Sequence, residues 1–133
     1  MVMIMFNWTS VVLAGGGAAI GATVRYLVMQ IAQLISHWRL QHSGRVPSRF
    51  PWPTFLINVS GSFMLGWVMS SGLNTGIKVL VGAGVLGGFT TFSTMANEIV
   101  LLARDQRLRL AVWYGIFSLL CGVLAAVVGM KLN

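Results

Sequence analysis

Two kinds of polar group occur inside otherwise apolar stretches of this sequence, and both are suited to holding a small ion. Thr54 and Asn58 are four residues apart, so they share one face if the segment is helical. Tyr114 and Ser118 have the same spacing. Their hydroxyl and amide groups donate hydrogen bonds, which suits an anion. The second kind of group is the backbone carbonyl, which is a ligand for a cation where a helix is broken.

Such a break is expected in the run Gly84–Met95, which is a poor continuous helix. It contains three glycines, followed by Thr90, Thr91, Ser93 and Thr94. Glycine lowers helix stability, and β-branched side chains crowd the preceding turn. Non-helical backbone at membrane depth is tolerated only where it is buried in protein or lines a water-filled cavity. A kink that simply packs against its neighbours is the alternative.

The composition places these groups in a membrane. The chain has 133 residues, with 9 Lys or Arg, 2 Asp or Glu and a net charge of +7, so that 8% of its residues are charged. A soluble domain carries about 25% charged residues, which argues against an ordinary soluble enzyme. Four long stretches contain no charged or histidine side chain: Met1–Val24, Phe50–Ile77, Val79–Asn97 and Leu110–Met130.

These stretches predict an all-α integral membrane protein with a single domain, residues 1–133. About 20 apolar residues cross a bilayer as a helix. We expect four transmembrane helices, the third of them broken, near residues 11–34, 54–71, 77–103 and 110–130.

Oligomerisation is expected because four helices of this length enclose little volume. Small residues recur at four-residue spacing, as in Gly17 and Gly21 or Gly84 and Gly88, and this spacing lets helices approach closely. Generic helix packing without a functional meaning is the alternative for any one of these pairs.

Basic residues separate the hydrophobic blocks. They do not form a patch interleaved with stacking aromatic residues, so contact with lipid headgroups is expected and no nucleic-acid partner is. Lys78 and Lys131 are expected on one side of the membrane, and six arginines on the other: Arg39, Arg45, Arg49, Arg104, Arg107 and Arg109. The positive-inside rule would place the six-arginine side in the cytoplasm.

Glu98 and Arg25 are charged residues that lie well inside the predicted helices, away from their ends. Both are costly in hydrocarbon, so each should face a cavity, a partner or the membrane interface. Together with the hydroxyl and amide groups they describe a polar track. The track has many donors, aromatic ring edges with positive quadrupole charge and one acidic side chain, so it favours a small anion over a cation. For Asn58 alone, a hydrogen bond between helices is the alternative.

Three runs resemble signature segments of the CrcB/Fluc family of fluoride channels: Gly15–Tyr26, Thr54–Phe63 and Gly87–Thr94. The resemblance covers essentially the whole chain. It implies a passive channel, and no enzyme, that exports cytoplasmic fluoride across the bacterial inner (plasma) membrane as a multi-pass protein. It also implies an antiparallel dual-topology dimer with two fluoride pores and a structural Na⁺ at the centre.

The resemblance implies roles for individual residues. The backbone carbonyls of Gly87 and Thr90 match the sodium ligands at the break in the third helix. Other positions match the fluoride pore: Arg25 in the vestibule, then Thr54, Asn58, Phe92, Ser93, Thr94, Glu98, Tyr114 and Ser118. Met95 departs from the family, because most members have a second pore phenylalanine there. Gly122 lacks a hydroxyl that some members have.

Alternatives to a homodimer channel remain at this stage. The loop charges favour a fixed pair with a paralogous subunit, because a chain that inserts both ways should have nearly balanced loops. The otherwise intact pore residues favour an antiparallel homodimer, which we expect. A small dual-topology multidrug transporter has a similar size but needs a buried carboxylate in its first helix, and the first two helices here contain no Asp or Glu. No nucleophile and base set for an enzyme is evident.

Overall fold

The described part of the chain is built from helices. The computed structural model describes residues 8–44 and 49–132, and none of these residues is in a strand. In chain order the helices are α1 (Trp8–Ser43), α2 (Trp52–Ser70), α3 (Thr75–Lys78), the π-helix η1 (Val79–Leu86), α4 (Gly87–Phe89), α5 (Phe92–Arg104) and α6 (Leu108–Lys131). The predicted all-α class is confirmed.

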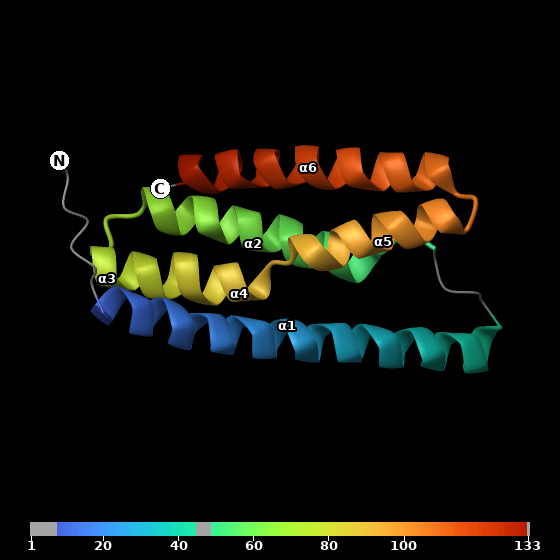
Figure 1. Ribbon diagram of the computed structural model, residues 1–133, viewed down its shortest axis with the longest axis horizontal. Coiled ribbons are helices and arrows are strands. Elements are labelled where there is room, and N and C mark those ends of the chain that lie inside the picture. The colour runs from blue at the N-terminus through green and yellow to red at the C-terminus, as the bar shows by residue number, and fades with distance from the viewer. Residues whose placement is uncertain (1–7, 45–48, 133) are drawn as a thin grey trace.

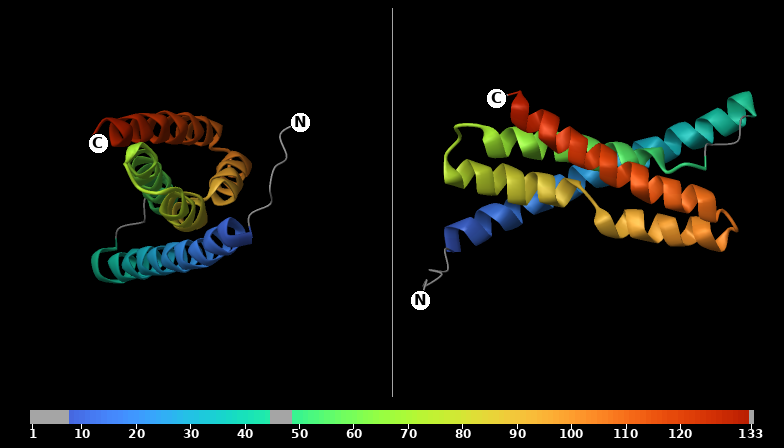
Figure 2. Two further views of the ribbon diagram at one scale, coloured as in Figure 1. Left: turned by 90° about the vertical axis from the view of Figure 1, so that its left-hand side faces the viewer. Right: turned by 90° about the horizontal axis from the view of Figure 1, so that it is seen from above.

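The helices run side by side along the long axis of the molecule (Figure 1). α3, η1 and α4 follow one another beside α1, whereas α5 lies beyond a break and packs on α6. α2 packs along α6, between that helix and the layer of α1 (Figure 2). The start of α1, the α2–α3 turn and the end of α6 share one end of the molecule, so Lys78 and Lys131 lie there. Arg39 and Arg104 lie toward the opposite end, as expected, and Arg45 falls outside the described residues.

The helix ends follow from local sequence. Pro53 stands in the first turn of α2, where its missing N–H leaves no hydrogen bond unmade. Asn74 caps α3, because its Oδ1 accepts a hydrogen bond from Ile77 N at 2.9 Å. Thr91 caps α5 in the same way, accepting from Thr94 N at 3.2 Å.

The small residues of α1 lie against the backbone of η1 and α4. A Cβ atom on Gly21 would collide with the Val85 carbonyl oxygen, and one on Gly88 with the Ala18 carbonyl oxygen. A Cβ atom on Gly84 would come within 2.9 Å of Gly17 Cα. The four-residue spacing of small residues therefore marks a close backbone contact within one chain.

One feature of this contact was not predicted. Residues Val79–Leu86 form a π-helix and not an α-helix. Gly82 and Gly84 lie inside it, and their lack of side chains leaves room for the widened turns. A four-residue spacing places small residues near one face in either helix type, so the sequence pattern could not distinguish them.

Three segments are long and apolar enough to cross a membrane: Trp8–Ser43, Thr75–Arg104 and Leu108–Lys131. Helix α2 has 19 residues and is not among these three segments, and it carries Thr54, Asn58 and three serines. Its crossing therefore stays a prediction, although about 19 residues at about 1.5 Å each would span most of a hydrocarbon core.

Helix α1 is longer than expected. The predicted membrane span ends near residue 34, and the helix continues beyond it to Ser43. His37 and His42 lie on this extended part of the helix, and the His42 ring stacks on Trp38 with the ring centroids 4.7 Å apart. Charged residues mark where a helix leaves hydrocarbon, and they do not mark where it ends.

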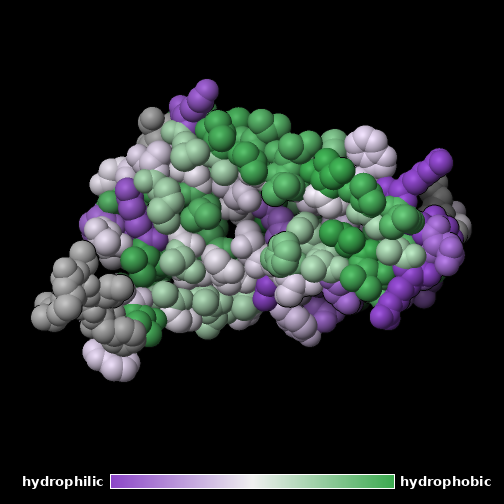
Figure 3. Space-filling model, turned by 45° about the horizontal axis from the view of Figure 1, so that its top comes forward, coloured by the Kyte–Doolittle hydropathy of each residue, from purple (hydrophilic) through white to green (hydrophobic). Residues whose placement is uncertain are grey.

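The surface supports a membrane setting. Large apolar side chains are exposed along the helices, including Val12, Trp113 and Leu119. Figure 3 shows hydrophobic residues over the middle of the molecule and hydrophilic ones concentrated toward its ends. Such a continuous apolar surface is exceptional for a soluble monomer.

Candidate functional site

The candidate site is centred on the break between α4 and α5. Thr90 has φ −74° and ψ 157°, and Thr91 has φ −148° and ψ 109°, so both residues are extended. The helical axis is interrupted there and resumes with Phe92. The break predicted for Gly84–Met95 is confirmed and is located at these two threonines.

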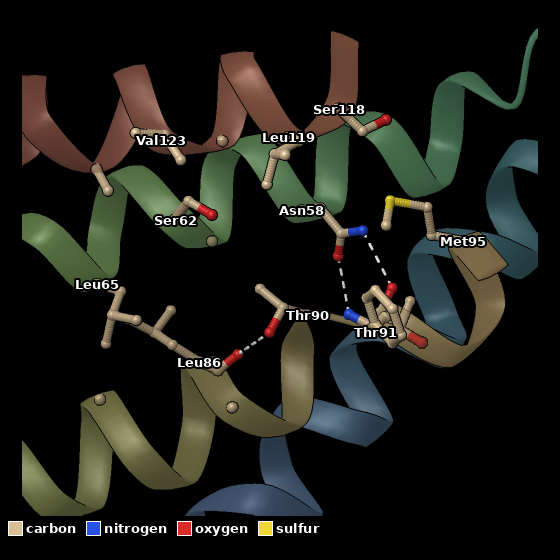
Figure 4. A pocket seen from close by; sticks show the side chains of 16 residues that line it. Asn58, Ser62, Leu65, Leu86, Thr90, Thr91, Met95, Ser118, Leu119 and Val123 are labelled. Carbon is tan, nitrogen blue, oxygen red and sulfur yellow. Dashed lines mark hydrogen bonds between the residues drawn. The ribbon is translucent and has the colours of Figure 1, made fainter. Parts of the chain in front are cut away.

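Asn58 of α2 holds the break in place. Its Nδ2 donates to the Thr91 carbonyl oxygen at 3.0 Å, and its Oδ1 accepts from Thr91 N at 2.8 Å (Figure 4). The paired donor and acceptor fix the orientation of the amide, since a flipped amide would face two mismatched groups. One N–H of Nδ2 remains after these bonds. The expected donor is therefore present, and Asn58 also makes the hydrogen bond between helices that was the alternative for this residue.

The break also frees backbone carbonyls. In a continuous helix Thr91 N would pair with the Gly87 carbonyl, but here it donates to Asn58. Thr94 N would pair with the Thr90 carbonyl, but it donates to the Thr91 side chain. The Thr90 carbonyl instead accepts from Arg25 Nη1 at 3.1 Å. The two predicted sodium ligands are thus released from helical pairing, and one of them faces a guanidinium group.

A cavity of about 390 Å³ lies between α2, α6 and the break. It brings together several of the predicted residues: Asn58, Gly87, Thr90, Phe92, Met95 and Ser118. Figure 4 shows Asn58, Thr90 and Thr91 meeting across it, with Leu119 and Val123 of α6 on the facing wall. The rest of the lining is mainly apolar, so a ligand in the cavity would meet only a few polar groups.

Ser118 is a buried polar group of the cavity that has no internal partner among the described residues. Its side chain is 5% exposed, and its Oγ is the one buried side-chain nitrogen or oxygen without a hydrogen bond in residues 8–44 and 49–132. An unpaired buried hydroxyl is costly, so native structures normally provide it with a partner. A water molecule or an anion in the cavity would satisfy it.

Three other predicted residues form a second cluster, beside the cavity. Glu98 of α5 accepts a hydrogen bond from Thr54 Oγ1 at its Oε1 and from Tyr114 OH at its Oε2, each at 2.7 Å. Thr54 and Tyr114 are both completely buried. Three different helices therefore meet at one carboxyl group, and both of its oxygens are occupied.

The remaining predicted residues have other surroundings. Thr94 Oγ1 accepts from Thr91 Oγ1 at 2.9 Å, and Ser93 Oγ lies 3.4 Å from the same Thr91 oxygen, so both belong to the cap of α5. Phe92 lines the cavity, yet its side chain is 77% exposed. Met95 is half-buried and packs on the apolar cluster that contains Phe55.

Two residues of the site were missed as individual positions in the sequence. Thr91 is the residue of the break to which Asn58 bonds, and it caps α5 by accepting from Thr94 N. A threonine just before a helix is a typical cap, which is the signal that could have identified it. Ser62 lines the cavity and lies one turn from Asn58, a spacing that could have identified it.

The site around the break can bind an anion through its hydrogen-bond donors or a cation through its backbone carbonyl oxygens. Among the described residues no group of His, Cys, Asp and Glu side chains could hold a metal ion. The carbonyls of Gly87 and Thr90 are backbone oxygens that the break leaves free of helical pairing.

Comparison with known proteins identifies the family. Residues 12–130 match the family described as CrcB-like protein, Camphor Resistance (CrcB). The chain is 40% identical over 117 residues to Fluoride-specific ion channel FluC 1 of Lactiplantibacillus plantarum, covering 88% of this chain and 92% of that protein. It is 41% identical over 120 residues to Fluoride-specific ion channel FluC 2 of Lactobacillus acidophilus, covering 90% and 94%. This chain therefore belongs to the CrcB family.

Proposed function

We propose that this chain forms a passive, fluoride-selective channel that exports fluoride across the bacterial inner membrane. The observation that carries the proposal is the cavity beside the break, where the Ser118 hydroxyl and one Asn58 N–H have no internal acceptor. Two relatives that match almost the whole chain are named as fluoride-specific ion channels. Donors without acceptors in an apolar wall are what a dehydrating anion requires.

Such a channel needs no energy source. Hydrogen fluoride is a neutral weak acid that crosses membranes and dissociates in a more neutral cytoplasm, which traps fluoride inside. An inside-negative potential then drives the anion outward by about 2.3 kcal/mol per 100 mV. In the cavity, the Asn58 amide and the Ser118 hydroxyl would donate to fluoride while it loses water, and the Phe92 ring would offer its positive edge.

The working unit proposed here is an antiparallel dimer with two separate pathways. In one chain Phe92 is 77% exposed although it lines the cavity, and the cavity itself is open to the surroundings. A second copy would cover both features and exclude lipid from the pathway. The charge difference between the two ends of the chain keeps a paralogous partner as the alternative.

A structural sodium ion would lie between the two breaks of such a dimer. The hard carbonyl oxygens of Gly87 and Thr90 fit this ion, and two chains would supply four of them. A carbonyl has two lone pairs, so Thr90 could bind sodium while it accepts from Arg25. The positive charge of the bound ion would offset the repulsion between carbonyl oxygens that point toward one another. The nearby guanidinium opposes that charge, so Arg25 should weaken sodium binding.

Reconstitution of the purified chain into liposomes tests the channel directly. Vesicles loaded with potassium fluoride and treated with valinomycin should release fluoride to an electrode, whereas vesicles loaded with potassium chloride should release almost no chloride. Fluoride retention by protein-containing vesicles would overturn the proposal for this chain alone. Efflux that appears only with a second, oppositely oriented subunit would replace the homodimer with the heterodimer.

The dimer and the sodium site need a separate measurement. Single-molecule photobleaching in vesicles should show two copies for each active unit. Prolonged replacement of sodium by N-methyl-D-glucamine should reduce the dimer fraction, and Arg25→Gln should retain dimers at lower sodium than the parent chain. If neither the dimer fraction nor the fluoride efflux depends on sodium in either protein, the proposed sodium site is ruled out.

A further inference from the structure

The hydroxyl of Ser62 differs from the other hydroxyls of α2. Ser60 Oγ donates to the Leu56 carbonyl at 2.7 Å, and Ser70 Oγ donates to the Gly66 carbonyl at 3.0 Å. Thr54 donates to Glu98. Ser62 Oγ has no hydrogen-bond partner among the described residues. A serine inside a helix usually bonds back to its own backbone, so a free hydroxyl at membrane depth calls for another partner.

Ser62 points into the cavity. It is half-buried, it is four residues from Asn58, and Figure 4 shows its hydroxyl directed toward the open space that Asn58 also faces. Gly122 of the facing helix α6 lies close to this hydroxyl. A Cβ atom added there would lie 3.5 Å from Ser62 Oγ, so the glycine leaves the space before the hydroxyl open.

The donors of the cavity therefore form a sequence along α2 and α6. Asn58 and Ser118 lie near the break, and Ser62 follows one helical turn closer to the α2–α3 turn (Figure 4). One turn is about 5.4 Å along the axis, so an anion leaving the first donors meets the next one within a short step. The lining at that level is otherwise apolar, with Leu65 and Val123 beside it.

We propose that Ser62 is a further fluoride-binding residue, which receives the anion from Asn58 and Ser118 and donates its hydroxyl hydrogen to it. The inference rests on the proposed channel function and extends the pathway beyond the predicted residues. Gly122 has a defined part in it, because its missing side chain gives fluoride access to the Ser62 hydroxyl.

The first test removes the hydroxyl. Ser62→Ala should lower fluoride efflux about tenfold, as expected when a charged species loses one hydrogen bond. The matched control is Ser60→Ala, which removes a hydroxyl that serves only its own helix, and its efflux should stay within about twofold of the parent. Both proteins should elute as the parent does in detergent. Parent-like efflux of Ser62→Ala would overturn the inference and would mean that water alone satisfies this hydroxyl.

The second test moves the hydroxyl across the cavity. Gly122→Ser combined with Ser62→Ala places an oxygen from α6 in the same space and should recover most of the lost efflux. Gly122→Ala combined with Ser62→Ala adds a methyl group without an oxygen and should recover none. Equal recovery by both would show that volume and not hydrogen bonding matters, which contradicts the proposal. If the parent chain itself releases no fluoride, the channel function fails, and these comparisons separate that result from a failure at Ser62.

Discussion

Two helix contacts within this chain have opposite character. Where α1 meets η1 and α4, glycines such as Gly17 and Gly21 bring backbone against backbone. Where α2 and α6 meet the break, a mainly apolar cavity contains a few polar side chains, and among the described residues Ser62 and Ser118 have no hydrogen-bond partner. The first contact leaves no space for a side chain, whereas the second leaves space for an ion.

The difference shows how a small membrane protein can separate stability from function. The tight contact gains dispersion energy from close approach, which is the main attraction between helices in lipid. The open contact forgoes part of that energy and leaves donors unpaired. Asn58 and Arg25 join the two regions, because one reaches the break from α2 and the other reaches it from α1.

The largest effect is expected from filling the tight contact. Gly21→Leu puts a side chain where even a Cβ atom would collide with the Val85 carbonyl oxygen. Overpacking of this kind costs about 1–3 kcal/mol or more, so thermal unfolding in detergent should shift strongly and fluoride efflux should be lost with the fold. Gly15→Leu is the matched control, since a Cβ built there meets no atom of another described element within 4 Å. Equal stability of the two variants would mean that α1 is not held as described.

Asn58→Asp should abolish efflux while leaving most of the fold. The new carboxylate oxygen would face the Thr91 carbonyl, and its charge would repel an anion in the cavity. A loss of about 1–3 kcal/mol of stability accompanies the broken hydrogen bond. Asn74→Asp makes the same chemical change at a helix cap where Asp serves as well, and it should conduct normally. Efflux near the parent level in Asn58→Asp would contradict an anion pathway at this residue.

Tyr114→Phe should have a smaller effect, because Glu98 keeps its bond to Thr54. The loss of one hydrogen bond lowers the free energy of unfolding by about 0.5–1.5 kcal/mol, which is measured through the shift in the unfolding midpoint. Efflux should fall but remain detectable. The control is Tyr26→Phe, an exposed tyrosine on α1. An unchanged midpoint in Tyr114→Phe would show that the Glu98 cluster does not stabilise the helices around the cavity.

The smallest effect is expected from Met95→Phe. Met95 lines the cavity but also packs on the cluster around Phe55, where volume is limited. A ring there restores an aromatic edge at the cost of repacking, so efflux should change by about threefold or less while stability drops by about 1 kcal/mol. Leu119→Phe, on the opposite wall, provides a comparison at an exposed position. An efflux change above tenfold would make Met95 a principal determinant of conduction.

The sequence predicted the break and the shared face of Thr54 and Asn58 because both depend on local rules. Glycines and β-branched residues disfavour a helix wherever they occur, and four-residue spacing fixes a common face. The partners across helices could not be predicted in the same way. These partners depend on how three helices are rotated about their axes. The rotation decides that Asn58 bonds to Thr91 and that Glu98 bonds to both Thr54 and Tyr114.

The length of α1 and the π-helix were missed for a related reason. Hydrophobicity indicates where a segment meets lipid, but it does not indicate whether the backbone stays helical beyond the membrane. Helix α1 continues in this way up to Ser43. The π-helix Val79–Leu86 arises where the backbone meets α1, so it depends on tertiary contact. Ser62 was within reach of the spacing rule, but its free hydroxyl is visible only when the bonds of Ser60 are known.

The separation of basic residues along the chain has a consequence for electrical behaviour. Arg104 and Arg107 lie at one end of the molecule, and Lys78 and Lys131 lie at the other. An antiparallel pair would present one arginine-rich end on each membrane face, so the local anion concentration would be raised equally at both mouths. Its current in symmetric fluoride should then be the same at equal and opposite voltages. A parallel pair would rectify, most strongly at about 0.01 M salt, where charges act over about 30 Å.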